Sequence, residues 1–202
     1  MQIPVQELPR TAAAIMIAYG LGSLPFAVWI TRWSTGKDIH RTGSGHAGAT
    51  NVMRAAGWAV GASVLLLDLA KGYLAIALAI RLVGSPLGLG LAAAALVAGH
   101  CWPILAKMRG GMGLAAGGGA LVAVWPLGFV LAVGLAALMQ LLIRHSARGN
   151  FAGGLLLTPL WLLFGAGAQA LAIAAGIGIV ISIRATSNWH REYRELWFDR
   201  EP

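Results

Sequence analysis

The chain has 202 residues, of which 58% are hydrophobic and 11% are charged, and its formal net charge is +8. Soluble domains carry about 25% charged residues, so this composition excludes an ordinary water-soluble globule and indicates an integral membrane protein. One cysteine, Cys101, permits no internal disulfide. We expect a single transmembrane domain over residues 1–202, with no room for a separate soluble domain.

Long apolar runs follow one another along the chain, at residues 11–31, 55–80, 82–106, 113–143 and 149–183. About 20 residues cross the hydrocarbon core of a bilayer, so each of the first three runs is predicted to be one span. The first run continues directly into polar sequence. It is therefore interpreted as a retained helix and not as a cleaved signal peptide.

The last two runs are too long for one comfortable crossing. Trp125-Pro126 interrupts the first of them and residues 164–167, which include two glycines, interrupt the second; such residues are typical of turns. With five crossings, Arg144 and Arg148 would face the opposite side from the other basic loop residues. With seven crossings they share that side, as the positive-inside rule favours. We therefore expect an all-α integral membrane protein with about seven transmembrane helices, several of them short, its N-terminus outside and its C-terminus in the cytoplasm.

The C-terminal segment, about residues 184–202, alternates charges with Trp189, Tyr193 and Trp197. This pattern predicts an interfacial tail with aromatic anchors. Because the basic charge is explained by membrane topology, no nucleic-acid partner is expected.

Two glycine-rich polar segments, residues 43–51 and 109–113, interrupt the apolar sequence. Irregular backbone is not tolerated in lipid, so these segments must lie at a membrane surface or line a polar cavity. Glycine runs near arginines expose N–H groups and positive charge, which suits a phosphate-bearing ligand. The alternative is a pair of solvated loops between helices. A third basic loop, residues 144–148, is either part of the same site or a topology anchor.

Three ionisable residues fall within or at the end of predicted spans. Asp68 and Lys71 are three residues apart, on one helix face. Charges in a membrane are costly, so this pair either contacts substrate or forms an ion pair that fixes the helix beneath the loops. His100, at the end of the third span, is either a packing residue or a base. The five histidines show no metal-ligand spacing, so no metal is expected.

The motifs resemble those of the bacterial acyl-phosphate:glycerol-3-phosphate acyltransferases, the small seven-helix membrane family called PlsY. The resemblance covers nearly the whole chain and rests on residues 22–26, 43–54, 67–72, 99–103 and 109–113. It implies transfer of a fatty acyl group from acyl phosphate to the 1-hydroxyl of glycerol-3-phosphate, giving lysophosphatidic acid for phospholipid synthesis. It further implies a multi-pass protein of the bacterial inner membrane, surrounded by lipid and active at the cytoplasmic face, without cofactor or metal.

The resemblance assigns Ser44, Arg54 and Asn188 to catalysis, at positions that hold substrate. The polar segments and the resemblance together give a wider set of predicted substrate-binding residues: Gly43, Gly45, His46, Thr50, Asn51, His100, Arg109, Gly110, Gly111, Gly113 and Arg144.

The chain departs from the family pattern at several of its motif positions. Met112 replaces a lysine, Ala147 and Asn150 replace serines, Ala185 replaces a histidine and His46 replaces an asparagine. Two hypotheses therefore stand: an active acyltransferase, or a catalytically silent or substrate-shifted paralogue that binds a phosphorylated lipid or a partner. A transporter is disfavoured, because the polar residues cluster at one face and not near the middle of the bilayer.

Overall fold

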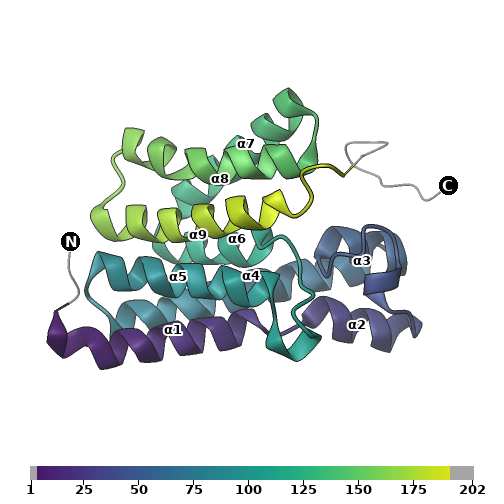
Figure 1. Ribbon diagram of the computed structural model, residues 1–202, viewed down its shortest axis with the longest axis horizontal. Coiled ribbons are helices and arrows are strands. Elements are labelled where there is room, and N and C mark those ends of the chain that lie inside the picture. The colour runs from purple at the N-terminus through teal and green to yellow at the C-terminus, as the bar shows by residue number, and fades with distance from the viewer. Residues whose placement is uncertain (1–3, 192–202) are drawn as a thin grey trace.

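The computed structural model describes residues 4–191, which form helices and loops without any strand. The α-helices in this part of the chain are α1 (Leu8–Gly22), α2 (Phe26–Thr35), α3 (Ala49–Ala56), α4 (Trp58–Leu82), α5 (Pro86–Cys101), α6 (Leu114–Val124), α7 (Pro126–Ile143), α8 (Ser146–Leu163) and α9 (Ala168–Thr186). Short 3-10 helices are η1 (Val5–Glu7), η2 (Ile39–Arg41) and η3 (Ile104–Ala106). Most of the long helices run along one common direction (Figure 1). The predicted interfacial tail falls largely outside the described residues.

Within residues 4–191, five helical segments are long and apolar enough to cross a membrane, namely Val5–Thr35, Trp58–Leu82, Pro86–Ala106, Pro126–Ile143 and Ala168–Thr186. Helix α6 is apolar but has 11 residues, which span about 16 Å against a hydrocarbon core of about 30 Å. Helix α8 carries Arg148 and Asn150 in its first turns. The fold is thus an all-helical membrane bundle with a short helix in its second half, as the long apolar runs predicted.

Both predicted interruptions of the long apolar runs are confirmed. Helix α6 ends at Val124 and α7 begins at Pro126, whose missing N–H is tolerated at the first position of a helix. Helix α8 ends at Leu163 and α9 begins at Ala168, after the glycine-containing turn.

The first predicted span is not one helix, which corrects the expectation for residues 11–31. Helix α1 ends at Gly22 and α2 begins at Phe26. Pro25 lacks an N–H and disfavours helical geometry in Leu24, so the helix breaks there. The break leaves the Leu24 carbonyl outside either helix, and it accepts a hydrogen bond from Lys71 Nζ on α4 at 2.9 Å.

Small residues bring the helices into close contact. A Cβ on Gly99 of α5 would meet the Tyr19 carbonyl of α1, and one on Gly176 of α9 would meet the Gly90 carbonyl of α5. Membrane helices associate by such close packing, since lipid supplies no hydrophobic drive between them. In contrast, Gly128 is the one buried residue of α7, so α7 presents most of its surface to the surroundings of the bundle.

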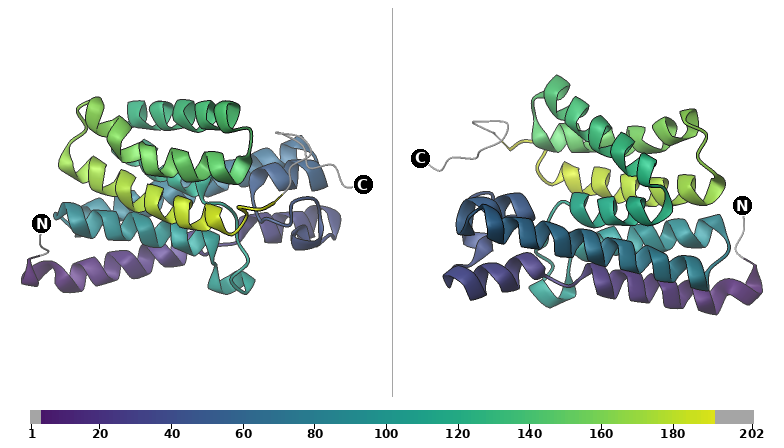
Figure 2. Two further views of the ribbon diagram at one scale, coloured as in Figure 1. Left: turned by 45° about the horizontal axis from the view of Figure 1, so that its top comes forward. Right: turned by 180° about the vertical axis from the view of Figure 1, so that it is seen from behind.

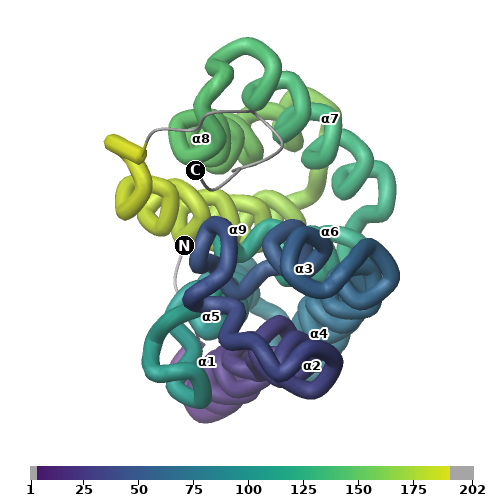
Figure 3. Tube along the Cα trace, turned by 90° about the vertical axis from the view of Figure 1, so that its right-hand side faces the viewer, coloured from purple at the N-terminus to yellow at the C-terminus, as the bar shows by residue number. Residues whose placement is uncertain are grey.

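Four polar segments that are far apart in the sequence gather at one end of the bundle, here called the polar end: residues 36–48, 102–113, 144–146 and 187–191. Figure 2 shows this end in two further views, and Figure 3 looks directly onto it. Hydrogen bonds join three of the segments, from Ala47 N to the Gly110 carbonyl at 3.4 Å and from Arg191 Nη1 to the Ser44 carbonyl at 3.0 Å. The remaining segment, residues 144–146, is followed closely by Arg148, whose guanidinium lies over the Trp189 ring at 5.4 Å.

Candidate functional site

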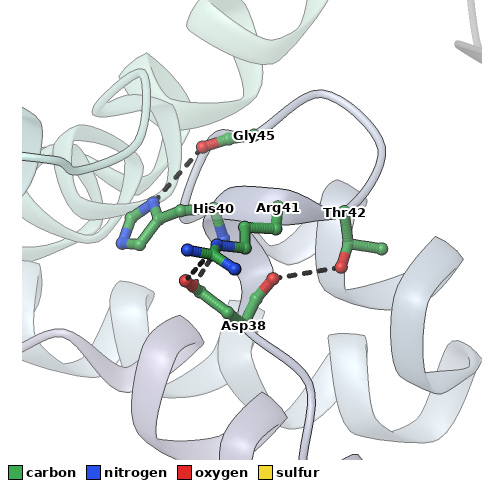
Figure 4. Close-up of polar contacts among 5 residues, drawn as sticks. All are labelled: Asp38, His40, Arg41, Thr42 and Gly45. Atoms are coloured by element: carbon green, nitrogen blue, oxygen red, sulfur yellow. Dashed lines mark hydrogen bonds and ion pairs between the residues drawn. The ribbon is translucent and has the colours of Figure 1, made fainter.

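The loop between α2 and α3 is folded by its own side chains (Figure 4). Asp38 Oδ1 accepts a hydrogen bond from His40 N at 3.0 Å, and its carbonyl accepts one from Thr42 Oγ1 at 3.1 Å. Arg41 Nε lies 3.9 Å from Asp38 Oδ2, and His40 Nδ1 lies 3.3 Å from the Gly45 carbonyl. These contacts give the predicted ligand-binding segment a defined shape.

Asn51, the third residue of α3, holds this loop from beneath. Its Oδ1 accepts a hydrogen bond from Ser44 N at 3.1 Å, while its Nδ2 lies within hydrogen-bond distance of the carbonyls of Thr42 (2.9 Å), His46 (3.0 Å) and Ile39 (3.3 Å). The residue is 3% exposed. Both ends of the amide are engaged with backbone, so Asn51 acts on a ligand by positioning the loop, and its predicted direct contact with substrate stays a prediction.

The second glycine-rich segment folds back on the end of α5. Gly110 N donates to the Cys101 carbonyl and Gly111 N to the His100 carbonyl, each at 3.2 Å. From the opposite side, Arg184 Nε donates to the Gly111 carbonyl at 3.1 Å and Arg184 Nη2 to the Gly110 carbonyl at 3.4 Å. The amides of Gly110 and Gly111 are therefore used within the protein in this arrangement, and the anion nest expected from them is not open.

A cavity of about 660 Å³ begins at the polar end and continues between α4, α6, α7, α8 and α9. This volume lies within the range of about 300–1,000 Å³ typical of ligand sites. Its polar lining includes Ser44, His46, Thr50, Arg54, Gln140, Asn150 and Arg191. Its apolar lining includes Leu65, Leu69, Leu121, Phe129, Val133 and Ile177. The cavity thus joins a polar, cationic entrance to a hydrocarbon-lined interior.

Apart from Asn188, the predicted site residues divide into four groups. Those that line the cavity are Ser44, His46, Thr50, Asn51, Arg54, His100 and Gly113. Gly43 and Gly45 shape the loop through positive φ angles of 50° and 68°. Gly110 lines a separate cavity, and Gly111 packs against His100. The side chains of Arg109 and Arg144 are exposed and lie outside the lining.

Asn188, predicted to be catalytic, is not part of the cavity lining but contacts two residues that are. Its Nδ2 lies 3.1 Å from His46 Nε2 and 3.7 Å from Met112 Sδ, and both of these residues line the cavity. The structure therefore places Ser44 and Arg54 in the wall of one cavity and Asn188 beside that wall, although 144 positions separate Ser44 from Asn188 in sequence.

The predicted pairing of Asp68 with Lys71 is confirmed. Lys71 Nζ lies 2.8 Å from Asp68 Oδ1, and His100 Nδ1 lies 3.6 Å from the same oxygen. All three side chains are buried. The cluster lies beside a small cavity of about 10 Å³ that Gly110 also lines, while Asp68 and His100 additionally line the large cavity.

Two further lining residues were not singled out by sequence analysis. Gln140 Nε2 donates to Asn150 Oδ1 at 2.9 Å and to the Ser146 carbonyl at 3.2 Å. Gln140 could have been identified from the sequence, because it is a lone amide within a long apolar run and polar side chains in a membrane span usually face the protein interior. Arg191 was counted only as a basic tail residue. Within residues 4–191, no group of three or more His, Cys, Asp or Glu side chains could hold a metal ion.

Comparison with known proteins gives one consistent result. The family model described as glycerol-3-phosphate acyltransferase matches residues 12–195. A glycerol-3-phosphate acyltransferase of Myxococcus xanthus is 40% identical over 148 residues, which cover 71% of this chain and 76% of that protein. One of Desulforamulus reducens is 36% identical over 152 residues, which cover 75% of this chain and 76% of that protein.

Solved structures agree with these sequence matches. The chain resembles a crystal structure of PlsY, an integral membrane glycerol 3-phosphate acyltransferase, in its glycerol 3-phosphate form, with a TM-score of 0.77, 30% identity and 90% coverage of both chains. Its similarity to the lysophosphatidic acid form has a TM-score of 0.74, with 26% identity and the same coverage.

Proposed function

The chain belongs to the glycerol-3-phosphate acyltransferase family, and from that membership we propose that it transfers a fatty acyl group from acyl phosphate to the 1-hydroxyl of glycerol-3-phosphate. The products are lysophosphatidic acid and inorganic phosphate. The related PlsY crystal structures are described as glycerol 3-phosphate and lysophosphatidic acid forms, which supports these two molecules as acceptor and product.

The observation that carries this proposal is the two-part character of the large cavity. Its entrance has the guanidinium groups of Arg54 and Arg191, and its interior is lined by residues such as Leu69, Phe129 and Ile177. An acyl phosphate has an anionic head and a hydrocarbon chain, and glycerol-3-phosphate is a small anion. A cavity of this kind accommodates the head groups beside each other at the entrance while the acyl chain extends inward.

The reaction requires placement more than activation, because an acyl phosphate is already an activated donor. The 1-hydroxyl oxygen attacks the acyl carbonyl carbon and forms the ester C–O bond. The bond from that carbon to the bridging phosphate oxygen breaks, and phosphate leaves with the electron pair and takes up the hydroxyl proton. Arg54 is proposed to hold substrate phosphate through charge-assisted hydrogen bonds, with Ser44 and Asn188 orienting the substrates beside it.

We further propose a single domain that crosses the bacterial inner membrane seven times. Helices α6 and α8 then cross as short or tilted spans, at a modest mismatch cost. The polar end lies at the cytoplasmic face, because it carries basic residues such as Lys37, Arg41, Lys107 and Arg144. The N-terminus lies outside and the C-terminus in the cytoplasm.

The direct test uses protein purified into lipid nanodiscs, with labelled glycerol-3-phosphate and palmitoyl phosphate as substrates. Labelled lysophosphatidic acid should form in proportion to the amount of protein. Absence of any acylated product over a wide range of protein concentrations would contradict the enzymatic function.

A silent or substrate-shifted paralogue is the second candidate. Met112 lines the cavity where the family pattern has a lysine, and Ala147 and Ala185, each 0% exposed, replace polar residues. Loss of one charged hydrogen bond corresponds to about 1.5–3 kcal/mol, or roughly one to two decades in rate. Such a protein would bind a phosphorylated lipid without turnover.

Met112→Lys discriminates between the two candidates better than Ala185→His, because Met112 is only partly buried and Ala185 has no exposed surface. Activity that appears only in the Met112→Lys protein would identify a decayed enzyme. Substantial turnover by the wild-type protein would rule out a catalytically silent paralogue.

A further inference from the structure

Helices α7 and α8 pack side by side (Figure 2) and bring two amide side chains together in the wall of the large cavity. Gln140 lies in the last turn of α7, and Asn150 lies in the second turn of α8. Both residues line the cavity, and Asn150 is 5% exposed. An amide is costly in apolar surroundings unless its donors and acceptors are paired, so the partner of each amide atom is informative.

The hydrogen bonds of Gln140 fix the orientation of both amides. Its Nε2 donates to the Ser146 carbonyl at 3.2 Å, and a backbone carbonyl can only accept. The Asn150 atom that lies 2.9 Å from the same Nε2 must then also be an acceptor, which is Oδ1. Both N–H groups of Gln140 are thereby used. Gln140 Oε1 and the N–H groups of Asn150 have no hydrogen-bond partner among the described residues.

Glycines leave room for this arrangement. A Cβ on Gly149 would lie 3.2 Å from Gln140 Cδ and Nε2 and 3.3 Å from its Oε1, so a larger residue would crowd the amide. Neither Gln140 Oε1 nor Asn150 Nδ2 belongs to the unpaired polar atoms that the described part of the protein encloses completely. The cavity that both residues line therefore has an accessible acceptor beside an accessible donor.

A donor next to an acceptor selects the chemistry of the group that binds there. An ionised phosphate or a carbonyl has only acceptors, and either would leave Gln140 Oε1 facing another oxygen. A hydroxyl both donates and accepts, so it pairs with both amides at once. Of the two substrates proposed above, glycerol-3-phosphate has hydroxyls, whereas the acyl phosphate has a carbonyl, a phosphate and a hydrocarbon chain.

We propose that Gln140 and Asn150 form a subsite for the 2-hydroxyl of glycerol-3-phosphate. Asn150 Nδ2 donates to the hydroxyl oxygen, and the hydroxyl donates to Gln140 Oε1. The proposed reaction leaves the 2-hydroxyl unchanged, so this group stays bound while the neighbouring 1-hydroxyl attacks the donor. The inference rests on the proposed function, because that function supplies the acceptor. The two amides then determine specificity for acceptors that have a hydroxyl next to the reacting carbon.

The test compares glycerol-3-phosphate with 3-hydroxypropyl phosphate, which keeps the phosphate and the reacting primary hydroxyl but lacks the 2-hydroxyl. The proteins are wild type, Gln140→Leu, Asn150→Ala, the double variant and the control Gln169→Leu, all in lipid nanodiscs. Gln169 Nε2 donates to the Gly84 carbonyl at 3.1 Å outside the cavity lining, so the control removes a hydrogen-bonded amide elsewhere. For each protein, kcat/KM is measured for both acceptors, and KM is measured for palmitoyl phosphate.

Wild type should have a kcat/KM for glycerol-3-phosphate at least about tenfold above that for 3-hydroxypropyl phosphate, because the analogue leaves the two amides unpaired. Each single variant should lose most of this preference through a lower kcat/KM for glycerol-3-phosphate. The double variant should lose no more than either, because the two amides act as a unit. The control should keep the wild-type preference, and KM for palmitoyl phosphate should change little in every protein.

Three results would overturn the proposal. The first is a wild type that uses both acceptors equally well. The second is an equal loss of kcat/KM for both acceptors in Gln140→Leu and Asn150→Ala, which would show a purely structural role. The third is a higher KM for palmitoyl phosphate with an unchanged acceptor preference, which would show that the amides bind the donor.

Binding measured without an acyl donor separates this inference from the enzymatic proposal. If wild type shows no turnover but binds glycerol-3-phosphate at least about tenfold more tightly than 3-hydroxypropyl phosphate, and Gln140→Leu removes that difference, the subsite stands and only acyl transfer fails. Turnover without any acceptor preference refutes the subsite and leaves the enzymatic function in place. If wild type shows neither turnover nor binding of either compound, both proposals are refuted.

Discussion

Arg54 projects from the short helix α3 into the wall of the large cavity. Arg54→Ala should abolish binding of glycerol-3-phosphate, because it removes a charge-assisted contact from the cavity entrance. Membrane insertion should not change, since the residue lies on the short helix α3 and not in a membrane-crossing helix. Binding of labelled glycerol-3-phosphate and the yield of purified protein check the two parts. Unchanged affinity, with Arg41→Ala as the matched control, would show that the role assigned to Arg54 is wrong.

Asn51 is the residue on which the shape of the first polar loop depends most. Asn51→Ala should lower the free energy of unfolding by about 2–3 kcal/mol, because it leaves several buried backbone groups without partners. Hydrogen exchange of residues 39–46 should rise in the same variant, and thermal unfolding should move to lower temperature. Thr50→Ala, at an exposed neighbouring position, is the control and should leave both measurements near wild type. Unchanged exchange in Asn51→Ala would contradict the positioning role.

The sequence indicated which segments form the candidate site more clearly than it indicated what each residue in them contacts. The segment of residues 43–51, with Arg54 nearby, was predicted as one ligand-binding unit. Ser44 and Asn51 both line the cavity, but the sequence pattern does not show that the Asn51 amide is occupied by the loop. Arg191 and Ser44 are brought together only by the tertiary fold. Their contact could not be inferred from spacing.

At the scale of the helices, the breaks at Trp125-Pro126 and at residues 164–167 were predictable because the apolar runs were too long for one crossing. The break at Ser23–Pro25 was not predicted, because the run around it has the length of a single span. Its proline was a local signal, but hydropathy alone gives no reason to divide a run of ordinary length.

Helix α8 lines the cavity at Gly153, where a Cβ can be added without displacing backbone. The nearest atom to a Cβ there is Met139 Cγ at 3.9 Å. Gly153→Leu should reduce kcat/KM for palmitoyl phosphate about tenfold relative to an eight-carbon acyl phosphate, because the added side chain occupies space needed by the longer chain.

The control for this change is Gly134→Leu on α7, where a Cβ has nothing within 4 Å and the position lies outside the cavity lining. It should leave the ratio of the two donors unchanged. If Gly153→Leu lowers kcat/KM equally for the long and the short acyl phosphate, the acyl chain binds elsewhere.

At the scale of the whole molecule, the positive-inside argument predicted that the basic loops share one side, and the structure gathers those in the described chain at one end. Which side of the membrane this end faces is tested with single cysteines and a membrane-impermeant maleimide. Arg41→Cys and Arg148→Cys should be labelled in inside-out vesicles, and Arg10→Cys in spheroplasts. The native Cys101 is 0% exposed and should give little background. Labelling of Arg148→Cys in spheroplasts would overturn the seven-span topology.

The hydrogen bond from Lys71 to the Leu24 carbonyl has a consequence for how the protein is assembled in a cell. A broken helix leaves a carbonyl that lipid cannot satisfy, and a lysine in the next span adds an ammonium that lipid excludes. In the folded protein the Lys71 ammonium donates a hydrogen bond to the Leu24 carbonyl, and Asp68 balances the charge of the lysine. We therefore expect the segment from Leu8 to Thr35 and helix α4 to insert together as a hairpin, before the remaining helices are added around them.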